Sequence, residues 1–309
     1  MRIGNFEING AKKTFIIAEV AQAHDGSLGQ AHSYIDAVAK AGADAIKFQT
    51  HIAEAESTLD ENFRISMSGQ DQNRYEYWQR TSFTPNQWLE LSKHANQKDL
   101  IFLSSPFSKE AIDLLSKIGI PAWKVGSGEV FNFSLIDLIL KQGGPILLST
   151  GMSSWEEINK IIEYILEKGG DPAILQCTTQ YPTPLNEVGL NILKELQKRY
   201  HIPSGLSDHS GTPWPSLAAL AYESDLLEVH VTFDRSIYGP DSSSSLNFSE
   251  LNMICKANKA FSEMRNNPVD KDSKANKLNA TKQLFTKSLS LKYDLPSGTL
   301  LTEDLLVLK

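Results

Sequence analysis

Eight short apolar segments rich in β-forming residues recur through the first three quarters of the 309-residue sequence. Most of them are continuous rather than alternating, which is typical of strands that are covered on both faces in a parallel sheet. They occupy residues 15–20, 44–50, 100–107, 122–128, 145–151, 173–179, 203–209 and 226–233. Parallel neighbours need a crossover segment between them, so the residues between these runs are expected to hold helices.

Amphipathic segments that fit helices separate many of the apolar runs. They cover residues 30–41, 108–118, 153–168, 187–199, 213–222 and 248–265, and a further helix is expected after residue 84. Gly42 and Gly119 follow two of these segments as C-terminal stops, and Ser154 offers a helix cap. Eight strand-then-helix units in about 260 residues predict an α/β fold, a (β/α)8 TIM barrel over residues 1–263.

A doubly wound sheet remains the alternative fold, because periodicity alone does not show that a sheet closes on itself. A dinucleotide-binding version of that alternative is weakened, because no glycine-rich GxGxxG turn follows the first apolar run.

Two segments interrupt the alternation. Residues 51–84 are long for a connection between a strand and its helix, and they are either a surface insertion or a lid over the barrel mouth. Residues 264–281 are polar and charged and predict a linker, and residues 282–309 are too few for an independent core.

The composition narrows the partners and the compartment. A formal net charge of −7 argues against a nucleic-acid partner, and no apolar run approaches the roughly 20 residues that cross a bilayer. The first residues show no signal-peptide pattern, and Cys177 and Cys255 are too few for a disulfide framework. We therefore expect a cytoplasmic protein without a membrane partner.

Polar residues gather where the predicted strands end. Barrel enzymes carry their active sites at the C-terminal ends of the strands, so these residues are expected to face one site. A bound ligand explains them better than a buried structural network does, because buried polar groups are costly unless they are paired. They include Glu19, Lys47, Gln49, Ser105, Lys124, Ser127, Glu129, Ser149, Cys177, Tyr181, Ser207, His209, Glu228, His230 and Asp241.

The residue types indicate an anion site beside a site for a metal or for proton transfer. Lys47 and Lys124, together with the serine hydroxyls, suit a phosphate and a carboxylate, although an internal salt bridge would also explain either lysine. His209 and His230 could share a divalent metal, act in acid/base chemistry or make ordinary core hydrogen bonds. Lysines on barrel strands also fit a Schiff-base aldolase, and spacing does not separate these reactions.

Two carboxylates and one thiol complete this set of candidates. Glu19 and Glu129 are candidates for a general base or for recognition of a hydroxyl group, and they could instead be counterions of the two lysines. Cys177 is more consistent with packing than with a nucleophile, because no partner base can be named for it.

Eight motifs occur in order along the chain. They are AEVAQAHDGS at 18–27, IKFQTH at 46–51, FLSSPFS at 102–108, KVGSGE at 124–129, LSTGM at 148–152, QCTTQYPTP at 176–184, GLSDHS at 205–210 and GPD at 239–241. These motifs resemble those of the sialic acid synthase family, which includes N-acetylneuraminate, legionaminate and pseudaminate synthases. The resemblance covers about residues 3–260 and the tail.

This resemblance implies a transferase of carbohydrate biosynthesis on a (β/α)8 barrel. It implies that phosphoenolpyruvate condenses with the open aldehyde form of an N-acylated amino sugar, with release of phosphate. A divalent metal, Mn²⁺ or Mg²⁺, would be held by His209 and His230 and would polarise the aldehyde. The family also implies a homodimer.

Individual roles follow from the matching positions. The resemblance implies catalytic roles for Glu19, Lys47, Lys124, Glu129, His209 and His230, with Glu129 near the reacting carbons. Phosphoenolpyruvate contacts would come from Lys47, Gln49, Ser105, Lys124, Ser127, Ser149 and Ser207. Sugar contacts would come from Glu19, Gln70, Tyr181 and Asp241, with Gln70 standing where some members carry an asparagine.

The end of the sequence departs from the family pattern. Residues 282–309 match only the start of the small antifreeze-like (SAF) domain, so we expect an incomplete segment there. In the family this domain supplies an arginine to the sugar site of the partner subunit, and residues 282–309 do not include it. A pseudoenzyme that binds ligand without turnover is therefore a further alternative, beside the aldolase or a related phosphoenolpyruvate-condensing enzyme.

Overall fold

Eight parallel strands form the large sheet of the computed structural model, which describes residues 1–8, 13–63 and 70–309. In space the strands follow the order β5-β4-β3-β10-β9-β8-β7-β6, and the two end strands β5 and β6 contact each other. The strands are β3 (Phe15–Ala21), β4 (Ala45–Thr50), β5 (Ile101–Pro106), β6 (Trp123–Val125), β7 (Pro145–Ser149), β8 (Asp171–Cys177), β9 (Ser204–Asp208) and β10 (Leu226–His230).

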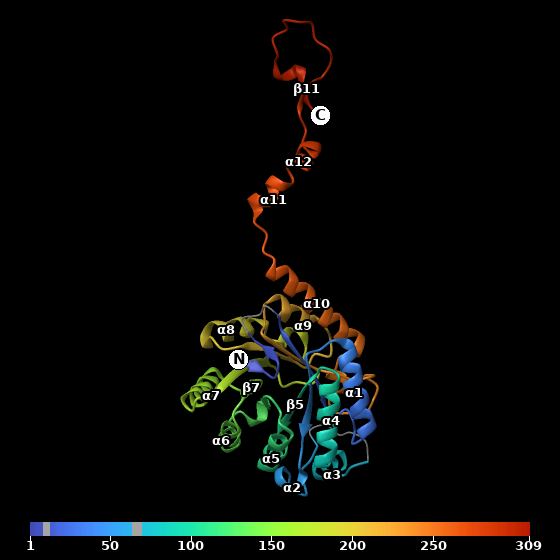
Figure 1. The fold of residues 1–309 in the computed structure, drawn as a ribbon, viewed down its shortest axis with the longest axis vertical. Helices are drawn as coiled ribbons and strands as arrows, with labels where there is room; N and C mark the ends of the chain where they lie inside the picture. The colour runs from blue at the N-terminus through green and yellow to red at the C-terminus, as the bar shows by residue number, and fades with distance from the viewer. Residues whose placement is uncertain (9–12, 64–69) are drawn as a thin grey trace. The chain divides into compact units, whose positions relative to one another are not determined.

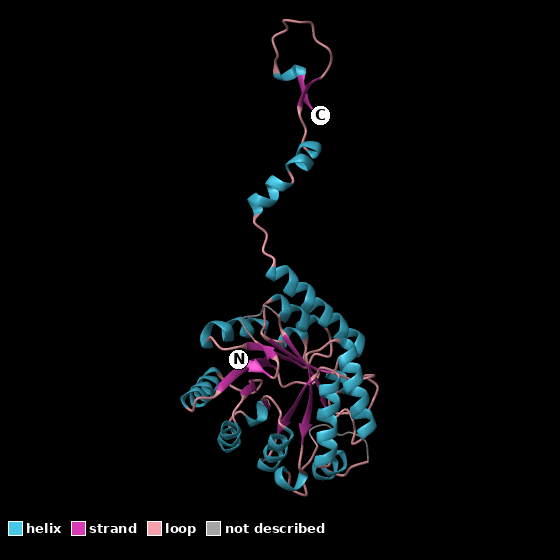
Figure 2. Cartoon of the chain, in the orientation of Figure 1, coloured by secondary structure: helices cyan, strands magenta, loops and turns pink. Residues whose placement is uncertain are grey.

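Helices surround this sheet on its outer face (Figure 1, Figure 2). The arrangement confirms the predicted (β/α)8 barrel, and the doubly wound alternative is wrong. The helices are α1 (Leu28–Ala41), α4 (Pro85–Gln97), α5 (Lys109–Ile118), α6 (Phe133–Gln142), α7 (Trp155–Glu167), α8 (Leu190–Tyr200), α9 (Trp214–Ala221) and α10 (Phe248–Asn266). Helix α6 is absent from the predicted set, although Leu135, Ile136 and Ile139 of its sequence FSLIDLILKQ form a buried face.

Side chains that point into the barrel change from apolar to polar along the strands. Successive residues of a strand face opposite sides, so every second residue enters the interior. The lower interior is an apolar layer of Ile17, Ala45, Leu103, Leu147, Leu175 and Leu226, packed with Ile3 and Ile8. The hairpin of β1 (Arg2–Ile3) and β2 (Phe6–Glu7) supplies part of this layer. The polar residues two positions further along each strand therefore lie above a closed apolar floor.

Capping residues mark the starts and ends of several helices where the sequence predicts them. Ser154 and Glu157 form a reciprocal capping box at the start of α7. Gly42 adopts a left-handed conformation at the end of α1, with φ of 93°, and Gly119 does the same after α5, with φ of 81°. Glycine adopts this conformation without the penalty that a Cβ atom brings.

The long segment over residues 51–84 is not a plain loop. It contains α2 (Ala53–Glu56) and α3 (Arg74–Thr81), and the buried side chains of Ala53, Tyr77 and Trp78 pack together. Arg64, which belongs to this predicted lid, lies outside the described residues.

The chain divides into two units, Met1–Glu263 and Met264–Lys309. The second unit carries two short helices and a pair of antiparallel strands, none of which has a buried residue. These are α11 (Lys271–Lys277), α12 (Asn279–Phe285), β11 (Leu289–Leu291) and β12 (Leu306–Leu308). The predicted linker therefore carries helical turns. None of the helices in the described residues is long and apolar enough to span a membrane.

Candidate active site

Lys47 and Glu19 form a buried ion pair at the centre of the barrel mouth. They occupy paired positions on the adjacent strands β4 and β3, and Lys47 Nζ lies 2.6 Å from Glu19 Oε2. Their side chains are 3% and 1% exposed. The other carboxylate oxygen, Glu19 Oε1, is buried and makes no hydrogen bond to a described residue. This oxygen can therefore accept a hydrogen bond from a molecule in the barrel mouth, or donate one to it when the carboxyl group is protonated.

Glu228 joins the two lysines. Its Oε2 lies 3.8 Å from Lys47 Nζ and its Oε1 lies 3.5 Å from Lys124 Nζ. Ser207 Oγ donates a hydrogen bond to Glu228 Oε1 at 3.1 Å. Glu19, Lys47, Glu228 and Lys124 thus form a chain of alternating charge, which we call the charged quartet.

Hydroxyl groups complete the coordination of both ammonium groups. Lys47 Nζ donates to Ser105 Oγ at 3.2 Å, and Lys124 Nζ donates to Ser149 Oγ at 2.8 Å. Ser127 Oγ accepts a hydrogen bond from the backbone N–H of Gly151 at 3.0 Å. Ammonium and hydroxyl donors on five strand ends therefore converge on one volume.

Burial and neighbouring charges shift the pKa values of the quartet in different directions. Burial raises the pKa of Glu19 and lowers the pKa of Lys124. Burial alone would raise the pKa of Glu228 and lower that of Lys47, but the opposite charges around each of them outweigh burial, so Glu228 is lowered and Lys47 is raised. Glu228 is thus the fixed anion of the quartet, whereas Glu19 can hold a proton near neutral pH.

The two histidines lie side by side at the same mouth. The ring centroids of His209 and His230 are 5.2 Å apart. His209 Nδ1 lies 3.0 Å from the carbonyl oxygen of Thr178, an acceptor, so the hydrogen resides on Nδ1. Its Nε2 then carries a lone pair and lies 3.2 Å from the hydroxyl of Tyr181.

The protonation state of His209 and a carboxylate near His230 bear on whether this pair can bind a metal ion. Burial lowers the pKa of His209 to about 4, so the ring is neutral at pH 7. Asp241 Oδ2 lies 3.9 Å from His230 Nδ1. A neutral imidazole whose other nitrogen is held by a carbonyl is the usual form of a metal-binding histidine. In the described parts of the chain, no third His, Cys, Asp or Glu completes a metal-binding group with them.

Most of the predicted site residues line one hollow, which we call the inner hollow. Glu129, Gln70 and Asp241 do not line it. Glu129 Oε2 accepts a hydrogen bond from Asn132, Gln70 lines a separate depression with Asp71 and Arg80, and Asp241 lines an adjoining hollow. The predicted site residues that do line the inner hollow are Glu19, Lys47, Gln49, Ser105, Lys124, Ser127, Ser149, Tyr181, Ser207, His209 and His230.

A second, more aromatic hollow adjoins the first and is called the outer hollow. Gln49, Tyr181 and His230 line both hollows, and Asp241 lines the outer one. Residues of the segment over 51–84 supply much of its wall, including Phe63, Arg74, Tyr77 and Trp78. That segment therefore does contribute to the barrel mouth, as the lid alternative predicts.

Sequence reasoning did not select several of these residues as site residues. The sequence places Glu228 only among the polar strand ends, although it lies two residues before His230 and so on the same face of β10. Thr179 and Phe107 also line the inner hollow. Trp78 belongs to the aromatic segment that the lid alternative covers, but spacing along the chain does not show that helix α3 brings it to the site.

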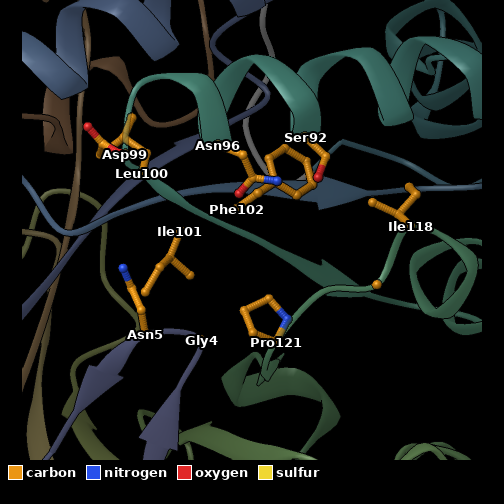
Figure 3. Close-up of a pocket in the computed structure, with 11 residues that line it drawn as sticks. Gly4, Asn5, Ser92, Asn96, Asp99, Leu100, Ile101, Phe102, Ile118 and Pro121 are labelled. Carbon is orange, nitrogen blue, oxygen red and sulfur yellow. The ribbon is translucent and has the colours of Figure 1, made fainter.

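Another hollow lies at the opposite end of the barrel (Figure 3). Gly4 and Asn5 of the β1–β2 turn line it with residues at the start of β5, including Leu100 and Ile101. Its lining includes one titratable side chain, Asp99, and no lysine or histidine. The charged and imidazole groups thus belong to the mouth at the strand C-termini.

Comparisons with known proteins agree with this geometry. The model of the NeuB family matches residues 34–270. An N,N'-diacetyllegionaminic acid synthase of Campylobacter jejuni is 33% identical over 304 residues, covering 96% of this chain and 90% of the relative. A pseudaminic acid synthase of the same species is 35% identical over 310 residues, covering 98% of this chain and 88% of the relative.

A solved structure shares the fold. The N-acetylneuraminic acid (sialic acid) synthetase of Leptospira borgpetersenii, in complex with citrate, superposes with a TM-score of 0.77. It is 24% identical, and the match covers 92% of this chain and 96% of that chain. At this level of identity the likeness supports the barrel architecture.

Proposed function

The chain belongs to the NeuB family of enzymes, and from that premise we propose that it is a nonulosonic acid synthase. In the proposed reaction phosphoenolpyruvate condenses with the open-chain aldehyde of an N-acylated amino sugar, and phosphate leaves. A carbon–carbon bond forms between the enol carbon and the aldehyde carbon. Water adds to the adjacent carbon, and the bond between this carbon and the phosphate oxygen breaks.

One observation carries this proposal above the others: two buried ammonium groups and several hydroxyls face the same inner hollow as the imidazoles of His209 and His230. With a proton on Glu19, the charged quartet has one more positive than negative charge. A bound anion would then offset the burial of Lys124. Phosphoenolpyruvate carries both a phosphate and a carboxylate, so it can use the two lysines together.

The outer hollow suits the sugar. Its aromatic rings provide apolar surface, while Gln49, Tyr181 and Asp241 provide hydrogen-bonding groups. Glu19 lines the inner hollow, and its Oε1 makes no hydrogen bond to a described residue. Its raised pKa lets it exchange a proton with a substrate hydroxyl or a water molecule.

His209 and His230 fit a divalent metal, Mn²⁺ or Mg²⁺, on the chemistry of their donors. Neutral His209 is oriented by the carbonyl of Thr178, and the second imidazole lies beside it. When bound, such a metal would act as a Lewis acid toward the sugar aldehyde. The carboxylate of Asp241 near His230 would balance part of its charge.

Phosphate release is the direct test. We expect release that requires phosphoenolpyruvate, one member of a panel of N-acylated hexosamines, and a divalent metal. Release without added metal, in chelator-treated protein, would contradict the assignment of the two histidines. Binding of phosphoenolpyruvate by calorimetry without turnover would instead support the pseudoenzyme alternative.

A Schiff-base aldolase is the second candidate, because burial lowers the pKa of Lys124 as that chemistry requires. Borohydride treatment with pyruvate separates the two reactions. The proposed synthase leaves no covalent adduct, whereas the aldolase leaves one on Lys124 or Lys47.

A further inference from the structure

The imidazole of His51 lies between two aromatic rings in the wall of the outer hollow. Its ring centroid is 3.6 Å from that of Trp78, at an interplanar angle of 5°, and 4.1 Å from that of Phe107, at 12°. The His51 side chain is 6% exposed. Two parallel neighbours restrict the ring to its own plane, so its two nitrogens face fixed partners.

Those partners are a carboxyl group and an amide. His51 Nδ1 lies 2.6 Å from Glu56 Oε1, and His51 Nε2 lies 3.2 Å from Gln49 Oε1. An amide oxygen only accepts hydrogen bonds, so Nε2 must carry a hydrogen. A second hydrogen must lie between Nδ1 and Glu56. The pair therefore holds two protons, wherever the inner one resides.

Burial favours a neutral pair with the inner proton on Glu56. Burial lowers the pKa of His51 to about 3 and raises the pKa of Glu56 to about 8. The charged groups that face Glu56 are Arg74, which lowers its pKa, and Glu61 and Glu129, which raise it. Arg74 is itself paired with Glu61 at 2.5 Å. Glu56 Oε2 is buried and makes no hydrogen bond to a described residue, which also disfavours a full carboxylate charge.

The state of this pair decides which end of the Gln49 amide faces the substrates. Gln49 lines both the inner and the outer hollow. When His51 Nε2–H holds the amide oxygen, the amide NH2 group is left for the hollow, and its hydrogens have no hydrogen-bond acceptor among the described residues.

We propose that Glu56 and His51 are positioning residues that hold Gln49 with its NH2 group toward the substrates. Gln49 then donates a hydrogen bond to a substrate oxygen and disfavours a substrate group that is itself a donor. When the pair loses one of its two protons, the remaining proton resides on Nδ1, where it bonds to the Glu56 carboxylate, and Nε2 is left without hydrogen. The amide of Gln49 then has to turn, because two acceptors would otherwise face each other. The substrate part of this inference rests on the proposed function.

The tautomer of His51 can be measured without any substrate. Protein labelled with 15N-histidine would be titrated by NMR, with the His51 signals assigned by their loss in His51→Asn. We expect a protonated Nε2 at pH 7 and a change to the Nδ1–H form as the pH rises through about 8. A bare Nε2 at pH 7 would overturn the proposal.

Two variants separate the effect of the Glu56–His51–Gln49 chain of hydrogen bonds, which we call the relay, from general structural effects. In Glu56→Gln the amide can still donate to Nδ1 but cannot ionise, so Nε2 should stay protonated up to pH 10. Glu54→Gln, at an exposed position of the same helix α2, should titrate like the unchanged protein. An alkaline change in Glu56→Gln equal to that of the unchanged protein would contradict the relay.

Kinetics then test the link to the substrates. Between pH 7 and pH 9 we expect the KM for at least one of the two substrates to rise by about tenfold, the worth of one neutral hydrogen bond. Glu56→Gln should remove this rise and Glu54→Gln should keep it. An equal rise in KM in the unchanged protein, Glu56→Gln and Glu54→Gln would overturn the proposal that this pair controls substrate binding through Gln49. A confirmed tautomer in a protein without turnover would count against the proposed function and leave the relay standing.

Discussion

The Oε1 atom of Glu228 lies 3.5 Å from the ammonium nitrogen of Lys124, in side chains that are 5% and 4% exposed. The two residues come from strands β10 and β6, which are not neighbours in the sheet. They meet only because the sheet closes and directs both side chains inward. This contact makes the stability of the protein depend on the charge of Glu228.

Neutralising Glu228 should destabilise the protein unless an anion is present. Glu228→Gln leaves Lys124 and Lys47 buried with only Glu19 to offset them, and removing one partner of a buried ion pair costs about 3–5 kcal/mol. We expect a lower midpoint of thermal unfolding and a larger recovery on addition of phosphoenolpyruvate than the unchanged protein shows.

The control for this experiment is Glu167→Gln, at an exposed position of α7. It should change neither the midpoint nor the response to phosphoenolpyruvate. A Glu228→Gln protein as stable as the control would show that the quartet does not depend on this carboxylate.

Removing His209 should weaken metal binding and abolish turnover while the barrel remains folded. The loss of a direct ligand should exceed the roughly 10–100-fold loss of affinity that follows removal of an outer partner. Calorimetric titration of His209→Ala with Mn²⁺, and circular dichroism, measure these two effects. His201→Ala, at an exposed position after α8, is the matched control. Near-normal Mn²⁺ affinity in His209→Ala would refute the assignment.

His24 should make the protein sensitive to acid. Burial, with a smaller contribution from His51, lowers its pKa to about 3, and its Nδ1 accepts a hydrogen bond from the backbone N–H of Gly26. The pKa is lower in the folded than in the unfolded chain, where it is near 6.5. The unfolding free energy that neutral His24 contributes is therefore present above pH 6.5. It is lost toward pH 3 at about 1.4 kcal/mol per pH unit.

Two asparagine variants test this pH dependence. His24→Asn keeps an acceptor for Gly26 and cannot protonate, so its unfolding free energy should fall less steeply below pH 6.5 in denaturant titrations. His201→Asn, at an exposed position, should retain the original slope. Identical slopes in both variants would show that His24 protonation does not drive acid unfolding.

A methyl group at Gly205 should disrupt the barrel. A Cβ atom there would lie 2.1 Å from the carbonyl oxygen of Leu226 on the neighbouring strand β10, which no side-chain rotation can relieve. We expect Gly205→Ala to give little soluble protein or a sharply lower unfolding midpoint. Gly29→Ala in α1, where the nearest atom is 3.9 Å away, should leave the midpoint equal or slightly higher. Normal stability of Gly205→Ala would contradict this packing.

Much of the site follows from the sequence through one rule of geometry. Residues two positions apart on a strand face the same side, and the C-terminal ends of parallel strands meet. Lys47 and Gln49, or Ser207 and His209, are therefore expected in one place once the barrel is recognised. The predicted homodimer and cytoplasmic location have no comparable local test and stay predictions.

Other parts of the site depend on residues that carry no local signal. Glu129 follows the same strand as Lys124, but the chain turns into a short helix at Ser127 and takes Glu129 out of the inner hollow. Gln70 lines neither hollow, but it lines a depression that shares Phe63 and Tyr77 with the outer hollow. Trp78 enters the outer hollow because α3 packs on α2, a contact that no periodicity encodes.

The sequence by itself determined the alternation of strands and helices, the helix caps and the polar residues at the strand ends, because these depend on spacing along the chain. Only the tertiary structure decided that Glu228 lies between two lysines and that His51 lies between Trp78 and Phe107. Such contacts join residues that are distant in the chain, and their protonation depends on burial, which exists only after the chain has folded.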